Sequence, residues 1–302
     1  MPRWGQFYLS GTCAKVPAEP RRSGAVSAIV IPPMGRLVLE RLSLSYAARS
    51  GAFLALSNVD FAVEDGEFVT IVGPSGCGKS TLLMLIAALL SPTSGTVRLD
   101  GRPVTAPGPD RALVFQDFAL LPWRTVLANV ELGLELKGVP VAERGAIARR
   151  HIAMVGLAAF ERSYPHQLSG GMRQRVGIAR ALAVEPQVLL MDEPFGALDA
   201  QIRQVMGAEL LRIWERGRKT ILFVTHDIDE AIYLADRTIV MSASPGRVIA
   251  DIPIALERPR PLDIRNAPAF TAYRQRIWDL LEREVLASNS WGEAPATKGT
   301  AA

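Results

Sequence analysis

The segment between residues 73 and 81 has the residue types and spacing of a loop that binds phosphate. It reads Gly73-Pro74-Ser75-Gly76-Cys77-Gly78-Lys79-Ser80-Thr81. Residues 73–80 match the pattern G-x-x-x-x-G-K-[ST], in which backbone N–H groups wrap phosphates and a following helix adds a favourable dipole. Lys79 would lie against the β and γ phosphates, and the Ser80 hydroxyl would bind Mg²⁺. The alternative is an ordinary glycine turn before a helix.

Two carboxylates and a histidine follow apolar runs later in the chain. Asp192 and Glu193 come directly after residues 188–191, and His226 closely follows residues 220–224. Asp192 would help to hold the same Mg²⁺, Glu193 would polarise the attacking water, and His226 would contact the γ-phosphate. Each also has a structural explanation, since paired carboxylates often form a helix N-cap or a surface pair, and a lone histidine is often structural.

A glycine pair opens another helix at Leu168-Ser169-Gly170-Gly171-Met172. A helix N-terminus exposed in this way can bind an anion. The chain already has a phosphate loop, so a second anion site needs a second phosphate. A head-to-tail dimer would supply it, with Ser169 and Gly171 of each copy capping the ATP held by the other. A plain N-cap at Ser169 is the alternative.

These residues lie where strands and helices alternate, which is the pattern of an α/β fold. The continuous apolar runs are typical of buried parallel strands. We expect strands at 37–46, 68–72, 112–115, 188–191 and 220–224, and helices at 80–90, 142–154, 171–183 and 269–286. The last helix carries an apolar stripe that we expect to pack on the chain's own core, with a partner protein as the alternative. The stripe consists of Phe270, Tyr273, Ile277, Leu280 and Leu281.

Composition narrows the class of protein. The chain has 302 residues, 49% of them hydrophobic, and a net charge of +4 that is too mild to indicate nucleic-acid binding. Only two cysteines are present, Cys13 and Cys77, which indicates a reducing cytoplasm rather than a disulfide framework. The longest apolar run, residues 82–90, is about half of what spans a bilayer, so a partner would have to supply any membrane span. Lysine is scarce, with 5 among 34 basic residues, which makes Lys79 more telling.

The ordered set of motifs resembles the ATP-binding subunits of ABC transporters, over residues from about 37 to 285. The matching segments are the Walker A loop at 73–80, the Q-loop at Gln116, the signature at 168–172, the Walker B strand into Asp192-Glu193, the D-loop Ala197-Leu198-Asp199 and the switch histidine His226. The resemblance implies the ABC ATPase fold: a P-loop core with a mixed sheet, an antiparallel β subdomain and an inserted helical subdomain. The signature differs from the common LSGGQ at Met172, but its serine and glycines are intact.

Residues 1–35 lack periodicity and contain several Pro, Gly and Arg, so they are expected to be a disordered extension. The ATPase domain would span 36–255, with a helical subdomain at about 117–183. A linker rich in Pro and Arg, an amphipathic helix and a frayed tail would occupy 256–302. The resemblance also implies residue roles. Catalytic roles fall on Lys79, Gln116, Glu193 and His226, and metal coordination on Ser80, Gln116 and Asp192. The nucleotide would be bound by Tyr46, Gly73, Pro74, Ser75, Gly76, Cys77, Gly78, Lys79, Ser80, Thr81, Ser169, Gly170, Gly171 and Asp199. Tyr46 would stack on adenine, with Phe53 as second choice because the loop between them is longer than usual.

A narrower likeness points to the nitrate, sulfonate and taurine import group. It rests on Pro122-Trp123, the run 169–175, the run 192–199, Ser244-Pro245-Gly246-Arg247 and Pro259-Arg260-Pro261. It implies an import ATPase that uses ATP and Mg²⁺ at the cytoplasmic face of the inner membrane and works with a second copy of itself, a permease and, indirectly, a solute-binding protein.

In this group, residues 117–135, with Phe118 and Trp123, would receive the permease; internal packing of these two aromatics is the alternative. The rival functions are an export ATPase, a soluble ABC ATPase acting on DNA or ribosomes, and a non-enzymatic regulatory subunit. We also expect alkylation of Cys77 to block ATP hydrolysis.

Overall fold

The computed structural model describes residues 35–48, 51–196 and 198–289. These residues all belong to one compact unit of the chain. The expected N-terminal extension lies outside them except for its last residue, as do residue 197 of the D-loop and the end of the expected C-terminal tail.

The phosphate loop and the acidic residues are placed by a six-stranded mixed sheet. Its strand order is β10-β9-β3-β8-β7-β6, and every neighbouring pair is parallel except β10 with β9. The strands are β3 (Phe68–Val72), β6 (Arg111–Val114), β7 (Val188–Asp192), β8 (Thr220–Val224), β9 (Arg237–Met241) and β10 (Val248–Pro253). Strands β3, β7 and β8 are parallel, so their carboxyl ends meet at one edge of the sheet.

A second, antiparallel sheet packs nearby. Its order is β2 (Gly51–Val63), β1 (Leu37–Ala48), β4 (Ser94–Leu99) and β5 (Arg102–Pro103). Helix α1 (Lys79–Ile86) lies between the two sheets, because Leu82 and Ile86 share one buried cluster with Leu37 of β1 and Val69 of β3. The helix was expected to continue to residue 90, but it ends earlier, where Ala88 adopts a left-handed backbone with φ of 55°.

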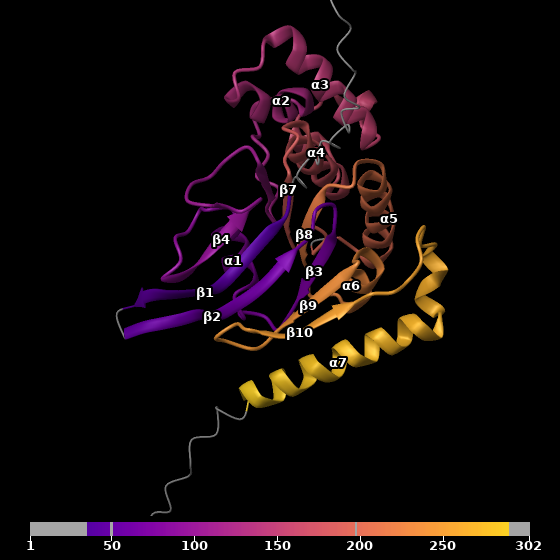
Figure 1. Cartoon of the computed structure of the whole chain (residues 1–302). Helices are drawn as coiled ribbons and strands as arrows, with labels where there is room; N and C mark the ends of the chain where they lie inside the picture. Colours follow the sequence, from indigo (N-terminus) through magenta and orange to yellow (C-terminus); the bar gives the residue numbers. More distant parts are fainter. Residues whose placement is uncertain (1–34, 49–50, 197, 290–302) are drawn as a thin grey trace, which may run out of the picture. The chain divides into compact units, whose positions relative to one another are not determined.

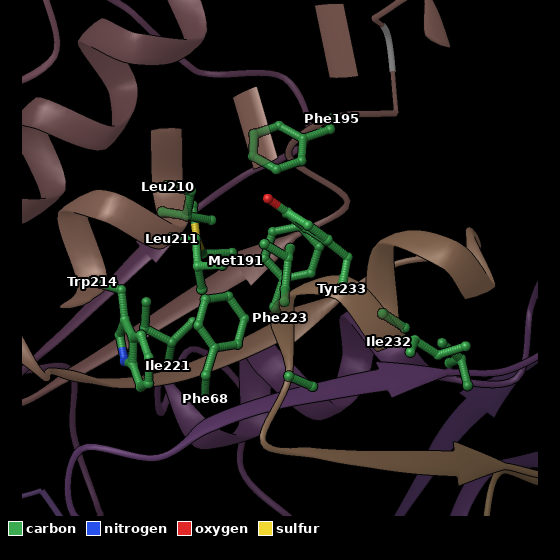
Figure 2. Packing of buried hydrophobic residues seen from close by; sticks show 14 of the residues in the cluster. Phe68, Met191, Phe195, Leu210, Leu211, Trp214, Ile221, Phe223, Ile232 and Tyr233 are labelled. Atoms are coloured by element: carbon green, nitrogen blue, oxygen red, sulfur yellow. The ribbon is translucent and has the colours of Figure 1, made fainter. Parts of the chain in front are cut away.

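The other face of the mixed sheet carries helices α5 (Ala200–Gly217), α6 (Ile228–Leu234) and α7 (Pro268–Asn289). Figure 2 shows residues of the core on this face. The centroid of the Phe223 ring lies 6.0 Å from that of Phe68 and 5.4 Å from that of Phe195. Phe270 and Ile277 of α7 are fully buried in this cluster, and the rest of the apolar stripe packs against it. The prediction that the stripe covers the chain's own core is confirmed.

A third packing unit is helical. Helices α2 (Val126–Leu136), α3 (Val141–Met154) and α4 (Gly170–Ala183) share their own apolar cluster and are grouped together at the top of Figure 1. Two short 3₁₀ turns, Ala158–Phe160 and Pro165–Gln167, connect α3 to α4, and a third, Leu262–Asn266, precedes α7. The mixed sheet, the antiparallel sheet and the helical unit together confirm the predicted fold class. Among the described residues, every helix is too short or too polar to span a bilayer.

Candidate functional site

The phosphate loop connects the end of β3 to the start of α1. Gly78 is the N-cap of α1, with φ of 98°. A Cβ atom there would stand 2.7 Å from Leu56 Cδ2, and one at Gly73 would stand 2.8 Å from Cys77 Sγ, so both positions require glycine. Gly78 offers no side-chain cap, and the first N–H groups of a helix have no intrahelical partner, so this end of α1 can bind an anion.

The Lys79 ammonium is enclosed by the loop. The residue is 6% exposed, and its Nζ donates to the carbonyls of Gly73 at 2.9 Å and Pro74 at 3.0 Å. A buried cation at the mouth of an N–H-rich loop supplies the charge that a phosphate chain requires.

Ser80 and Asp192 are 112 positions apart in sequence but meet in space. Ser80 Oγ donates to Asp192 Oδ1 at 3.1 Å. Burial raises the pKa of the Asp192 carboxyl; the Glu193 charge adds to this shift, while the Ser80 hydrogen bond and the Lys79 charge oppose it. Within the described chain no three acidic, cysteine or histidine side chains form a metal cage, so an ion here would take its other ligands from elsewhere. That fits Mg²⁺, which usually binds one or two protein oxygens together with substrate phosphates.

Glu193 and His226 form the second polar pair of this edge. His226 Nδ1 lies 2.9 Å from Glu193 Oε2, and the histidine side chain is 53% exposed. Glu193 adopts a left-handed backbone with φ of 41°, which is uncommon for a non-glycine residue and is typical of functional sites. Its N–H donates to Val224 O at 3.0 Å, which attaches this strained residue to β8. The pair therefore brings a carboxylate and an imidazole together where β7 and β8 end.

Gln116 follows β6 and lies beside Glu193. A Cβ atom at Gly196 would stand 3.4 Å from Gln116 Nε2 and 3.7 Å from Glu193 Oε2, so both groups face the same glycine. Among the hydrogen bonds of the described residues, none joins Gln116 to Ser80 or Asp192. The structure thus brings Gln116 to the predicted site, while its contact with a metal stays a prediction.

The two adenine-stacking candidates lie opposite each other. Tyr46 of β1 and Phe53 of β2 are register partners, and both rings are exposed. The Tyr46 hydroxyl lies 3.3 Å from Thr81 Oγ1 at the start of α1, which places this ring against the phosphate loop. Tyr46 therefore remains the first choice.

The signature segment lies elsewhere in the same copy. Ser169 is the N-cap of α4 and accepts from Met172 N at 3.3 Å, while Asp199 is the N-cap of α5. The segments are neighbours, since a Cβ atom at Gly171 would lie 3.5 Å from Ile202 Cγ2. No hydrogen bond within the described chain joins Ser169 to residues 73–81. The plain N-cap is present, and an anion role for Ser169, Gly170, Gly171 and Asp199 stays a prediction that needs a second copy.

The two aromatics of the expected docking surface differ. The Phe118 side chain packs on α4, where a Cβ atom at Gly177 would stand 3.6 Å from Phe118 Cβ. Trp123 is 71% exposed. Internal packing therefore explains Phe118 but not Trp123.

Sequence reasoning missed Thr225 and Glu230, which are buried beside the His226 loop. A signal was present, because Asp227 and Glu230 have the spacing of a helix N-cap and its third residue. The Asp227 side chain does accept from Glu230 N at 3.0 Å.

Cys77, whose alkylation is expected to block ATP hydrolysis, lies inside the phosphate loop. Its side chain is buried, and burial raises the pKa of its thiol.

Because the thiolate is the reactive form, we expect a Cys13→Ser variant to react with a disulfide reagent much more slowly when folded than in denaturant, and faster as pH rises. The absorbance of the released reagent thiol, followed at neutral and at alkaline pH, measures the rate of this reaction. Rapid stoichiometric labelling of the folded chain at neutral pH would show that the loop opens readily.

Comparison with known proteins agrees with this geometry. The ABC transporter family model matches residues 56–196. An uncharacterized ABC transporter ATP-binding protein of Methanocaldococcus jannaschii is 53% identical, covering 84% of this chain and 94% of the relative. A nitrate import ATP-binding protein of Synechocystis sp. is 47% identical, covering 83% and 99%. A bicarbonate transport ATP-binding protein of the same organism is also 47% identical, covering 81% and 88%.

A solved structure adds to the likeness. It is the dimeric post-hydrolysis state of an ATP-binding cassette bound to ADP and Pi. It is 36% identical in sequence with a TM-score of 0.66, covering 73% of this chain and all of that chain.

Proposed function

This chain belongs to the family of ABC transporter ATP-binding subunits and hydrolyses ATP, and we propose that it does so to drive import of a small anionic solute through a separate permease. The strongest support is the 47% identity to a nitrate import subunit, which covers 99% of that relative. The bicarbonate transport relative at the same identity supports a small anion as the class of solute, without selecting one. Sulfonates and taurine are further candidates for the transported solute.

The residues at the sheet edge divide the reaction among them. The phosphate loop and Lys79 bind the phosphate chain of ATP. Ser80 and Asp192 would hold Mg²⁺, which would offset charge on the phosphate oxygens. Glu193 accepts the proton of the attacking water, and His226, within hydrogen-bond distance of Glu193, contacts the γ-phosphate. Gln116, which faces Gly196 together with Glu193, would be a further ligand of the metal. Tyr46 stacks on the adenine.

The active form is a head-to-tail homodimer. Ser169, Gly170, Gly171 and Asp199 of one copy complete the nucleotide site of the other, which gives the exposed N-termini of α4 and α5 a use. The dimeric cassette with ADP and Pi supports this arrangement. ATP binding favours the closed dimer because both copies contact each nucleotide, and hydrolysis removes that preference.

The permease supplies the membrane span. We place its contact at residues 117–135, within a helical subdomain at about 117–183, where Trp123 is exposed. The chain is then peripheral at the cytoplasmic face of the inner membrane, and it serves an extracytoplasmic solute-binding protein only through the permease. The described residues after 255 extend the ATPase domain with α7. An export system and a non-transport ABC ATPase are the alternatives.

Capture of the permease tests this proposal. The tagged chain, carrying Glu193→Gln to preserve ATP, is purified from membranes of its own cells with ATP and Mg²⁺. We expect a multi-span membrane protein to co-purify. Adding Trp123→Glu should lower that capture at least about tenfold, since a central aromatic contributes about 2 kcal/mol or more to an interface.

Trp278→Glu on α7 is the matched control, because that tryptophan is also exposed, at 55%, but lies outside the proposed contact. It should capture as much as the parent. Recovery of soluble partners alone would favour the non-transport ATPase. Equal loss with both tryptophan variants would move the contact away from residues 117–135.

A further inference from the structure

Behind His226 lies a buried hydrogen-bonded turn that holds its backbone. The Asp227 N–H donates to Thr225 Oγ1 at 3.0 Å, so the hydroxyl closes a loop across His226. The Thr225 N–H is fixed in turn, donating to Ile71 O of β3 at 3.1 Å. The peptide group that follows the histidine is therefore tied to Thr225, and Thr225 is itself tied to β3.

The Thr225 hydroxyl is itself oriented by Glu230 of α6. Thr225 Oγ1 donates to Glu230 Oε2 in a short hydrogen bond, and both side chains are buried. A hydroxyl has one proton, and donating it to Glu230 leaves a lone pair aimed at the Asp227 N–H. Without this acceptor, the hydroxyl could rotate and release the turn.

A buried carboxyl is costly, which argues that this one has a use. Glu230 Oε1 is buried and has no hydrogen-bond partner within the described chain. The charged groups around it are Asp227, the N-cap of its own helix, Arg203 of α5 and Arg265 of the 3₁₀ turn before α7. The two arginines oppose the larger effect of burial. Burial raises the pKa of Glu230 to about 7, so near neutral pH the carboxyl is partly protonated. A half-satisfied polar group of this kind normally weakens a core.

We propose that Glu230 is a positioning residue for His226: through the Thr225 hydroxyl it fixes the turn that presents the imidazole to Glu193. This inference rests on the proposed role of His226 at the γ-phosphate. Two neighbouring ion pairs take no part in these hydrogen bonds. Arg203 donates to Asp227 Oδ2 at 3.0 Å, and Arg274 of α7 binds Asp229 through two hydrogen bonds.

Steady-state ATP hydrolysis by the full-length chain tests the role through two matched pairs. Thr225→Val removes the hydroxyl at nearly constant shape, and Thr225→Ser keeps it. Glu230→Met removes the acceptor, and Glu230→Gln keeps a neutral one close to the protonated carboxyl. We expect Thr225→Val and Glu230→Met to lower kcat by about 10- to 100-fold, the cost of misplacing a catalytic group, with KM for ATP changed by less than about twofold. Thr225→Ser and Glu230→Gln should keep kcat within about threefold of the parent, a factor well short of that loss.

Asp229→Asn is the control, because Asp229 neighbours Glu230 on α6 but faces Arg274. It should leave kcat and KM unchanged. The role is overturned if Glu230→Gln lowers kcat as much as Glu230→Met, if KM rises in proportion to the loss, or if Asp229→Asn has the same effect. Melting temperature and nucleotide binding show which variants are folded. Thr225→Ser and Glu230→Gln decide the question if the apolar variants do not fold. Absence of turnover in the parent chain would instead contradict the proposed catalytic site.

Discussion

Replacing Glu193 with Gln is expected to lower ATP turnover by roughly 100- to 10,000-fold, the range that a positioned general base contributes. Glutamine has nearly the same shape and can hydrogen bond to His226, whose Nδ1 lies 2.9 Å from Glu193 Oε2 in the parent. It cannot accept the proton of the attacking water. Because the change leaves the phosphate loop intact, ATP affinity should be preserved. Phosphate release under saturating ATP and Mg²⁺ measures the turnover.

The Glu193→Gln variant should accumulate as an ATP-bound dimer. If both copies contact each nucleotide, blocking hydrolysis removes the step that reopens the pair. Size-exclusion chromatography with light scattering should show a dimer with ATP and Mg²⁺ and a monomer without them. Glu185→Gln, at a residue whose side chain is 67% exposed, is the control and should behave as the parent. A persistent monomer of the Glu193 variant at saturating ATP would contradict the two-site dimer.

The edge of the mixed sheet where β3, β7 and β8 end could be predicted from the sequence, because its position follows from the type of strand. The runs that became β3, β7 and β8 are continuous and apolar, which indicates parallel strands buried on both faces. Whatever follows such strands emerges at a shared edge, and this is why Ser80 and Asp192 meet although they are far apart in the chain. The place of Ser80 and Asp192 at this edge was therefore open to prediction.

The contacts within that edge could not be predicted, because they depend on strand order and backbone conformation. The Glu193 and His226 pair requires β7 to neighbour β8 and requires a left-handed backbone at Glu193. Neither the order of the strands nor the backbone conformation at Glu193 can be predicted from composition. The buried Thr225 and Glu230 contact was missed for a related reason: a threonine beside a histidine is ordinary in sequence, and only burial makes its hydroxyl important.

Composition predicts a linker for the segment rich in proline and arginine before α7, and one of its arginines packs against α6. Arg260 there is 4% exposed, and its guanidinium donates to the carbonyls of Ile232, Tyr233 and Ala235 near the end of α6. Burial lowers its pKa to about 10. An arginine that satisfies the free carbonyls at a helix end acts as a C-cap, which sequence reasoning assigns only when the partner helix is known.

Replacing Lys79 with Ala is expected to abolish turnover and to weaken ATP binding by about 10- to 100-fold, given that a hydrogen bond to a charged group contributes about 1.5–3 kcal/mol. The ammonium is held inside the loop by the carbonyls of Gly73 and Pro74, so a phosphate chain in the loop meets a cation that is already in place. Alanine leaves the glycine loop free to fold but leaves those carbonyls, rather than a cation, near the phosphates.

Calorimetric titration with ATP measures the affinity, and Lys137→Ala is the matched control. The Lys137 ammonium also donates to a backbone carbonyl, that of Val184 at 2.7 Å, but it lies on the helical unit away from the loop. Loss of its charge should change neither affinity nor turnover. Lys79→Arg separates charge from shape, since a planar fork does not fit a pocket that encloses a compact ammonium. Turnover retained by Lys79→Ala would mean that residues 73–81 are not the phosphate site, because no other part of the proposed mechanism supplies this cation.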